Sequence, residues 1–203
     1  MTVLAVVVPC YNEQEVLPET ANRMIALLDR LVALKKVGAE SRIWFVDDGS
    51  RDRTWEVIRS FVQQGLPIIG IKLSRNRGHQ NALLAGLFTA EGDIVVSIDA
   101  DLQDDVNAIE QMIERYRDGS DVVYGVRQRR KTDTFLKRFT AESFYRLIAL
   151  CGAQTVFNHA DYRLLSRRAI EALKDYREVN LFLRGIVPLI GYRSSIVYYD
   201  REA

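Results

Sequence analysis

Cysteine and histidine are scarce in this chain of 203 residues, and their scarcity excludes several kinds of site. The two cysteines, Cys10 and Cys151, form no Cys-x-x-Cys pair. This argues against a disulfide framework or a zinc site and fits a reducing compartment. The two histidines, His79 and His159, are far apart in the sequence, so a histidine-based metal centre is not expected.

The chain also lacks a strong charge of either sign and lacks long apolar runs. Its formal net charge is +1, which gives no indication of a general attraction to nucleic acid. No apolar run approaches the roughly 20 residues that span a bilayer. The first residues lack the basic leader and the cleavage site of a signal peptide. Hydrophobic residues make up 48% of the chain, enough for the core of one large domain.

Predicted strands and helices alternate along the first 124 residues. We expect strands over 2–8, 42–46, 67–73, 93–98 and 121–124. We expect a helix that begins between residues 14 and 18 and runs to about residue 36, and further helices over 51–64, 79–90 and 106–117. This alternation predicts an α/β fold with a mostly parallel, doubly wound sheet and helices on both faces.

The pattern becomes less regular after Gly125. We expect helices over 134–150 and 166–174, a short strand over 161–165 and a final strand over 192–199. The helix over 134–150 has an apolar and a basic face, so it belongs either to the core or to a membrane surface. The apolar stretch 180–190, which contains Arg184, has the same two interpretations.

Carboxylates follow the predicted strands at their C-terminal ends. Asp99 and Asp101 come after the strand over 93–98, and the small residue Ala100 between them allows both to face one divalent cation. Glu13 and Asp48 follow two other strands. Each motif alone is also typical of a strand-to-helix turn. Their convergence at one sheet edge, where ligands bind in such folds, predicts a site instead.

Several nucleotide-binding and catalytic motifs are absent. The sequence contains no Gly-x-Gly-x-x-Gly dinucleotide fingerprint and no Gly-x-x-x-x-Gly-Lys-Ser/Thr phosphate-binding loop. It also contains no Gly-x-Ser-x-Gly nucleophile elbow. A bound phosphate would therefore be held mainly through a metal, for which Asp99 and Asp101 are the candidates.

Five motifs together resemble the motif series of family 2 glycosyltransferases. They are Pro9-x-Tyr11-Asn12-Glu13, Asp47-Asp48-Gly49-Ser50-x-Asp52, Arg75-Asn76-x-Gly78-His79-Gln80, Asp99-Ala100-Asp101-Leu102-Gln103-Asp104 and Asp161-Tyr162-Arg163-Leu164. The series is most similar to the polyprenyl-phosphate branch, which includes dolichyl-phosphate mannose synthases and bacterial undecaprenyl-phosphate glucosyltransferases. The resemblance covers essentially the whole chain. It implies a GT-A fold, a nucleotide-sugar donor, Mg²⁺ or Mn²⁺ as cofactor, and inversion at the anomeric carbon.

The resemblance also assigns roles to individual residues. It implies that the donor contacts Pro9, Tyr11, Glu13, Asp48, Asp99, Ala100, Asp101 and Gln103, with the metal at Asp99, Asp101 and Gln103. It implies that phosphate of the donor or acceptor contacts Arg127 and Arg138, and we expect Arg130 and Arg201 to bind phosphate as well. The residues expected at the reaction itself are Asp161, Asp101 and Arg127.

Several of the residues in these motifs need no catalytic role. An acceptor phosphate, with a second pKa of about 6, is already mostly ionised at neutral pH and needs no general base. We therefore predict that Asp161 orients a sugar hydroxyl or a basic residue such as Arg163. We expect Asp47 and the Asn76–Gly78 turn to be structural, and His79 to begin a helix without a catalytic role.

The expected function is transfer of a hexose, with UDP-glucose as the first choice of donor, to a polyprenyl phosphate for a cell-envelope glycan. The alternatives are GDP-mannose as donor, a saccharide or protein hydroxyl as acceptor, or a nucleotide-sugar-binding module without turnover. We expect one catalytic domain over 1–203, with a nucleotide-sugar half over 1–126 and an acceptor half over 127–203 that is truncated before a membrane anchor. The expected location is cytoplasmic, at the inner face of the membrane; a homo-oligomer is left open.

Overall fold

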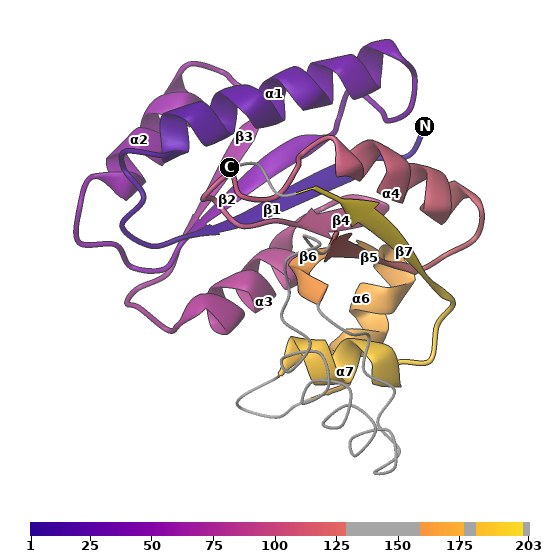
Figure 1. Ribbon diagram of the computed structural model, residues 1–203. Helices are drawn as coiled ribbons and strands as arrows, with labels where there is room; N and C mark the ends of the chain where they lie inside the picture. Colours follow the sequence, from indigo (N-terminus) through magenta and orange to yellow (C-terminus); the bar gives the residue numbers. More distant parts are fainter. Residues whose placement is uncertain (129–158, 177–181, 201–203) are drawn as a thin grey trace.

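A sheet of seven strands forms the centre of the residues that the computed structural model describes, which are 1–128, 159–176 and 182–200 (Figure 1). The strands are β1 (Leu4–Cys10), β2 (Arg42–Asp47), β3 (Ile68–Lys72), β4 (Ile94–Ser97), β5 (Val122–Arg127), β6 (His159–Ser166) and β7 (Ser194–Tyr199). The helices are α1 (Leu17–Ala33), α2 (Thr54–Gln63), α3 (His79–Thr89), α4 (Ala108–Arg117), α6 (Arg167–Leu173) and α7 (Leu183–Leu189). The strand order is β3-β2-β1-β4-β6-β5-β7.

The direction of each strand decides which segments meet at each edge of the sheet. β6 runs antiparallel to its neighbours β4 and β5, whereas the other neighbouring strands pair in parallel. Ser97 at the end of β4 lies opposite Arg163, so Asp161, two residues earlier in β6, lies beyond the end of β4. The start of β6 therefore shares an edge with the C-terminal ends of the parallel strands. The mostly parallel α/β sheet is confirmed.

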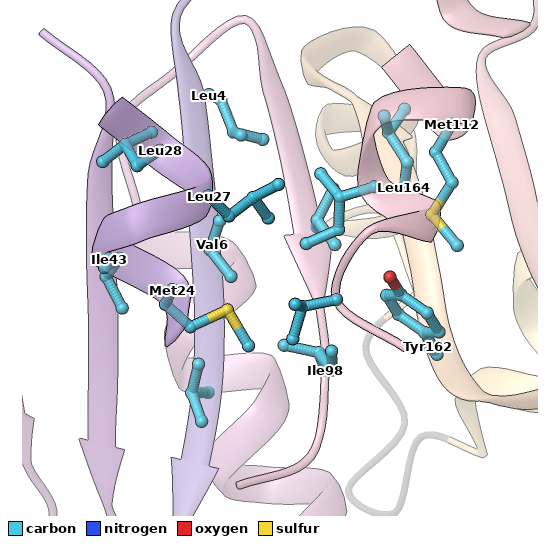
Figure 2. Packing of buried hydrophobic residues seen from close by; sticks show 14 of the residues in the cluster. Leu4, Val6, Met24, Leu27, Leu28, Ile43, Ile98, Met112, Tyr162 and Leu164 are labelled. Carbon is cyan, nitrogen blue, oxygen red and sulfur yellow. The ribbon is translucent and has the colours of Figure 1, made fainter. Parts of the chain in front are cut away.

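Apolar side chains cover both faces of the sheet, as strands buried on two sides require. α1, α2 and α4 pack on one face, and α3, α6 and α7 pack on the other (Figure 1). In β1, Leu4 and Val6 belong to the first layer, whereas Ala5 and Val7 belong to the second. Figure 2 shows the first layer, in which the α1 side chain of Met24 lies near Val6. The predicted covering of both faces by helices is confirmed.

β1 and β5 extend further at their C-terminal ends than predicted, and the additional residues of both strands lie at the same edge. Pro9 and Cys10, which lie beyond the predicted strand over 2–8, continue β1 because they pair with the last two residues of β2. β5 extends to Arg127 instead of ending at residue 124, because it pairs with β7 along the whole length of that strand. The turn after β1 therefore begins at Tyr11, directly at the sheet edge.

The later part of the chain agrees with the predicted order where it is described. α7 lies within the predicted apolar stretch 180–190, and its Leu183 and Val187 are buried against the sheet. Leu189 is 61% exposed, so only one side of this short helix belongs to the core. The helix expected over 134–150 lies outside the described residues. Among the helices within the described ranges, none combines the length and the apolar character needed to cross a membrane.

One buried hydrogen bond ties α1 to the loop that follows β4. The hydroxyl of Thr20, which is fully buried, donates to the carbonyl of Ala100 at 2.7 Å, compared with 3.1 Å to the carbonyl of Val16 in its own helix. The hydrogen bond to Ala100 therefore holds this loop against α1.

We expect Thr20→Val to lower the free energy of unfolding by about 1–3 kcal/mol, because the buried carbonyl of Ala100 loses its donor while the side chain keeps its shape. Denaturant unfolding measures this change, and Thr20→Ser is the matched variant because it keeps the hydroxyl. A Thr20→Val protein as stable as the wild type would contradict the prediction.

Candidate active site at the carboxyl edge of the sheet

A pocket of about 280 Å³ lies at the edge of the sheet where β1, β2 and β4 end. This volume is close to the lower end of the range of ligand pockets, about 300–1,000 Å³. Four separate segments of the chain contribute to it. The residues that line it are Pro9, Cys10, Tyr11, Glu13, Asp48, Asn76, Gly78, His79, Ala82, Asp99, Ala100 and Asp101.

The turn after β1 is held by the turn after β2. The backbone N–H of Asn12 donates to the hydroxyl of Ser50 at 3.0 Å, and the N–H of Glu13 donates to the hydroxyl of Thr54 at 2.8 Å. In return, the side-chain oxygen of Asn12 accepts from the N–H of Arg51 at 2.9 Å. Asn12 has a positive φ of 56°, a conformation that asparagine tolerates better than most residues. These contacts fix Glu13 at the rim of the pocket.

Asp48 holds the turn that precedes α3. Its carboxylate accepts hydrogen bonds from the backbone N–H groups of Arg77 at 2.7 Å and Gly78 at 2.9 Å. The same turn passes so close to Gly49 that a Cβ there would lie 2.5 Å from the backbone of Arg75, and the φ of Gly49 is +67°. Asp48 therefore has a structural contact beside its predicted role at the donor.

Asp47 and the turn over 76–78 were expected to be structural. The fully buried Asp47 accepts the N–H of Ser50 at 3.0 Å, which agrees with this expectation. Asn76 and Gly78, however, also line the pocket, so a ligand in the pocket would contact them.

The loop that carries Asp99 and Asp101 is anchored on both sides. Thr20 holds the carbonyl of Ala100, as described above, and the hydroxyl of Tyr162 donates to the carbonyl of Asp105 at 2.9 Å. Between these two anchors, Asp101 accepts the backbone N–H of Gln103 at 3.1 Å. The side chain of Asp99 is 36% exposed and that of Asp101 is more open, so both acids remain accessible to a ligand.

Arg127 was expected to bind phosphate, but in the structure its side chain contacts the loop that carries Asp99 and Asp101. Its Nε and Nη2 lie 2.9 and 2.8 Å from Oδ1 of Asp104, which is buried, and the hydroxyl of Tyr199 donates to the same oxygen at 2.6 Å. The positive charge of Arg127 is therefore matched by a buried carboxylate. Arg127 lies at the predicted edge but outside the pocket lining, and its contact with a substrate phosphate stays a prediction.

Asp161 is surrounded by donors. Its Oδ1 accepts from Nη2 of Arg163 at 2.5 Å, and its Oδ2 accepts from Nε2 of Gln80 at 3.0 Å. Arg184 of α7 adds a fork of two longer contacts, Nε to Oδ1 at 3.4 Å and Nη2 to Oδ2 at 3.3 Å. Burial alone would raise the pKa of Asp161, but the hydrogen bond with His79 and the two arginine charges hold it well below the usual range. The expected pairing with Arg163 is present.

His79 was expected only to begin a helix, and it has further contacts. It is the first residue of α3, and its Nε2 lies 3.5 Å from Oδ1 of Asp99 and 3.5 Å from Oδ2 of Asp161. The hydrogen bond with Asp161 raises the pKa of His79, burial opposes this change, and the charge of Asp99 adds to it. The imidazole therefore connects the pocket to Asp161, which the isolated sequence motif did not indicate.

The pocket is acidic. Glu13, Asp48, Asp99 and Asp101 line it, and His79 is the single side chain of the lining that can carry a positive charge. Burial raises the pKa of Glu13, and neighbouring carboxylates, Asp101 first among them, raise it further. Burial also raises the pKa of Asp99, with His79 opposing the change and nearby carboxylates adding to it. A site of this kind favours a ligand that brings a cation or hydroxyl donors.

The structure brings together most of the predicted donor residues. All of them except Gln103 line the pocket; Gln103 lies in the adjoining loop. Arg130, Arg138 and Arg201, which were predicted to bind phosphate, lie outside the described residues. Gln80 was named in one of the sequence motifs without a role of its own, and Arg184 was given no role. The signal for Arg184 was its charge within an otherwise apolar stretch, and the signal for Gln80 was its place at the end of the motif over 75–80.

Comparison with known sequences places this chain in a large group. The sequence model of Glycosyl transferase family 2 matches residues 5–174. The glycosyltransferase YkoT of Bacillus subtilis is 51% identical over 202 residues, covering 98% of this chain and 60% of that protein. The bactoprenol glucosyl transferase of Shigella phage SfV is 37% identical over 199 residues, covering 98% of this chain and 63% of that protein. The chain thus spans about three fifths of the length of these relatives.

Comparison with solved structures supports the fold. A mannosyltransferase from Pyrobaculum calidifontis, solved in complex with GDP-mannose and Mn²⁺, superimposes with a TM-score of 0.63 at 19% sequence identity. The match covers 98% of this chain and 56% of that one, and it confirms the expected GT-A-like architecture. Because the family model also covers more than half of the sequence, the chain belongs to glycosyl transferase family 2.

Proposed function

We propose that this chain is the catalytic part of a metal-dependent, inverting glycosyltransferase that moves a hexose from a nucleotide-diphosphate sugar to a polyprenyl phosphate. UDP-glucose is the proposed donor, and the inner face of the membrane is the proposed place of the reaction. The observation that carries the proposal is that seven of the eight residues predicted to bind the donor line one pocket. The similarity to a bactoprenol glucosyl transferase supports the choice of hexose and of lipid acceptor.

The residues at the pocket fit a divalent cation. Asp99 and Asp101 offer carboxylate oxygens, the ligands that Mg²⁺ and Mn²⁺ prefer. Crowding of negative charge around Asp99 contributes to its raised pKa, and a cation would relieve that repulsion. Within the described ranges, no three side chains of His, Cys, Asp or Glu are arranged to hold a metal ion. The donor diphosphate would therefore complete the coordination, and a role for Gln103 stays a prediction.

The reaction involves two negatively charged groups, the acceptor phosphate that attacks and the diphosphate that leaves. An oxygen of the acceptor phosphate forms a bond to the anomeric carbon, while the bond from this carbon to the diphosphate oxygen breaks and its electron pair leaves with the diphosphate. Attack on the face opposite to the leaving group inverts the configuration. A bound cation supplies stabilisation of the charge that develops on the leaving diphosphate. Asp99 and Asp101 position the donor for this step.

Asp161 is unsuited to the role of general base in this proposal. A good base has a pKa near the working pH, whereas the partners of Asp161 hold its pKa well below the usual range for a carboxyl group. A phosphate acceptor needs no base, because it is already ionised. Acceptors with a free hydroxyl would need one, so the state of Asp161 favours the phosphate over the saccharide or protein hydroxyl.

We expect nucleotide release from UDP-glucose to require both a divalent cation and a polyprenyl phosphate. The assay offers a panel of UDP- and GDP-sugars to the purified protein with Mg²⁺ or Mn²⁺, with and without the lipid, and EDTA should stop the release. Release from GDP-mannose alone would correct the donor. Release that needs a saccharide instead of the lipid would contradict the acceptor, and binding without release would contradict the activity.

We expect Asp101→Ala to weaken nucleotide binding in the presence of Mn²⁺ by at least about tenfold, or ~1.4 kcal/mol, because one of the two metal ligands is lost. Calorimetric titration with UDP, with and without the metal, measures this effect. Asp118→Ala is the matched control, because Asp118 is an exposed acid at the end of α4. The assignment fails if neither added metal nor the Asp101 substitution alters the affinity for UDP.

We expect Asp161→Asn to leave the shape of the pH–rate profile unchanged while turnover falls. Stability should also fall, by up to ~3–5 kcal/mol, since Arg163 is 1% exposed and loses its counter-charge. The folded pKa of Asp161 lies below the unfolded value of about 3.9. The stabilisation from the Asp161 carboxylate is therefore complete at pH values above the unfolded pKa, and it is lost only as the pH falls from there toward the folded pKa.

Profiles of kcat between pH 6 and 9 test this prediction, and Asp161→Glu, which keeps the charge, is the matched variant. A folded Asp161→Asn protein that binds both substrates normally but loses one limb of the profile would show that Asp161 is a base after all.

A further inference from the structure

Two arginines share the carboxylate of Asp161, and they differ in their surroundings. Arg163 is 1% exposed, makes the shorter contact of 2.5 Å and also donates to the carbonyl of Leu183. The side chain of Arg184 is 47% exposed and reaches Asp161 only at 3.3 and 3.4 Å, near the upper limit of a hydrogen bond. Arg163 is thus part of the core, whereas Arg184 faces the open side of the site.

The charges around Asp161 do not balance. One carboxylate faces two guanidinium groups, so the cluster has an excess of one positive charge before His79 is considered. Arg184 uses Nε and Nη2 for Asp161, and among the described residues its remaining N–H groups have no hydrogen-bond partner. Arg127, at the same edge, is in contrast matched by Asp104. Within the Asp161 cluster, Arg184 is therefore the guanidinium whose charge stays unmatched.

This positive cluster adjoins the acidic pocket. His79 bridges the two, with its Nε2 3.5 Å from an oxygen of Asp99 on one side and 3.5 Å from an oxygen of Asp161 on the other. A metal-bound diphosphate at Asp99 and a second phosphate at Arg184 would therefore lie next to each other. This is the arrangement that transfer between two phosphates requires.

Two exposed apolar side chains, Phe182 and Leu189, lie at the two ends of α7, the short helix that carries Arg184. The ring of Phe182, which is 62% exposed, lies so close to Gly185 that a Cβ there would be 2.9 Å from it. Leu189, at the end of the same helix, is 61% exposed. The apolar substituent of a phosphate monoester bound at Arg184 has exposed apolar side chains of the same short helix within its reach, and a free sugar has no such substituent.

We propose that Arg184 binds the phosphate of the acceptor, and that Asp161 is the positioning residue that aims its guanidinium at the donor. The inference rests on the proposed function, because it gives a place to the lipid phosphate of that reaction. The planar fork of arginine can hold Asp161 through one side and a phosphate through the other. In this arrangement Asp161 acts through Arg184 and does not touch the reacting atoms.

The test is Arg184→Gln, compared with Arg30→Gln as a matched control. Arg30 has a side chain that is 46% exposed and an ion pair of 3.4 Å with Glu110, so its environment resembles that of Arg184, but it lies on α1 away from the pocket. In the steady state, Arg184→Gln should raise the KM for undecaprenyl phosphate at least about tenfold. The KM for the donor should stay within about twofold, and Arg184→Lys should restore part of the loss. Arg30→Gln should change neither constant.

A binding experiment separates this inference from the proposed function. Citronellyl phosphate, a short prenyl monophosphate, and inorganic phosphate are titrated into the wild type and Arg184→Gln in the presence of UDP and Mn²⁺. The prenyl compound should bind the wild type more tightly than inorganic phosphate does, and Arg184→Gln should lose this binding.

Each outcome of the two experiments has a defined meaning. Equal KM values for the lipid in wild type and Arg184→Gln would overturn the role of Arg184 and leave the proposed function standing. Binding of the prenyl compound that depends on Arg184, without any transfer, would support the site and overturn the proposed function. If neither phosphate bound the wild type and no transfer occurred, both proposals would fail.

Discussion

The antiparallel insertion of β6 between β4 and β5 is the constraint on which the candidate site depends. Because β6 runs opposite to its neighbours, its first residues lie where the parallel strands end. The hydroxyl of Ser97 at the end of β4 donates to the carbonyl of Asp161 at 2.5 Å, and this bond fixes the register of the two strands at the edge. A parallel β6 would place Asp161 at the opposite edge, far from Asp99. One reversed strand thus joins segments that are more than 60 residues apart in the sequence.

The carboxylates of this edge fall into two groups that differ in their partners. Asp48 accepts backbone N–H groups, Asp104 binds Arg127 and Tyr199, and Asp161 binds arginine; each of these has its charge matched by the fold. Asp99 and Glu13 lie mainly among other carboxylates, and both have raised pKa values. An acid with a matched charge holds a loop or a side chain in place. Acids without a matched charge repel one another, and a bound cation relieves this repulsion. This distinction, and not the number of acids, separates scaffold from ligand site.

Much of the fold and part of the site could be predicted from local patterns. Alternating strands and helices specify a parallel α/β sheet, and the acids after its strands indicate the functional edge. The sequence could not show that Arg127 meets Asp104, that His79 lies between Asp99 and Asp161, or that Arg184 reaches Asp161. These contacts join residues about 20 to 80 positions apart and depend on strand order and on the direction of β6. Local periodicity carries no information about either. The lone charge of Arg184 in an apolar stretch was a sign of a buried partner, but it did not identify the partner.

The state of Asp161 decides between two kinds of chemistry at one edge. A carboxylate that activates an alcohol must be free to take a proton, and donors on both oxygens oppose this. The same donors are useful if the acceptor is a phosphate, because such an acceptor needs a fixed cation and no base. For that role the cation must be oriented by a carboxylate without being neutralised by it. Arg163 is buried and Arg127 is matched by Asp104, so neither meets this requirement, whereas the half-exposed Arg184 does. The proposed function thus gives each of the two arginines beside Asp161 its own task. Arg163 neutralises the carboxylate, and Arg184 keeps a positive charge that can bind the acceptor phosphate.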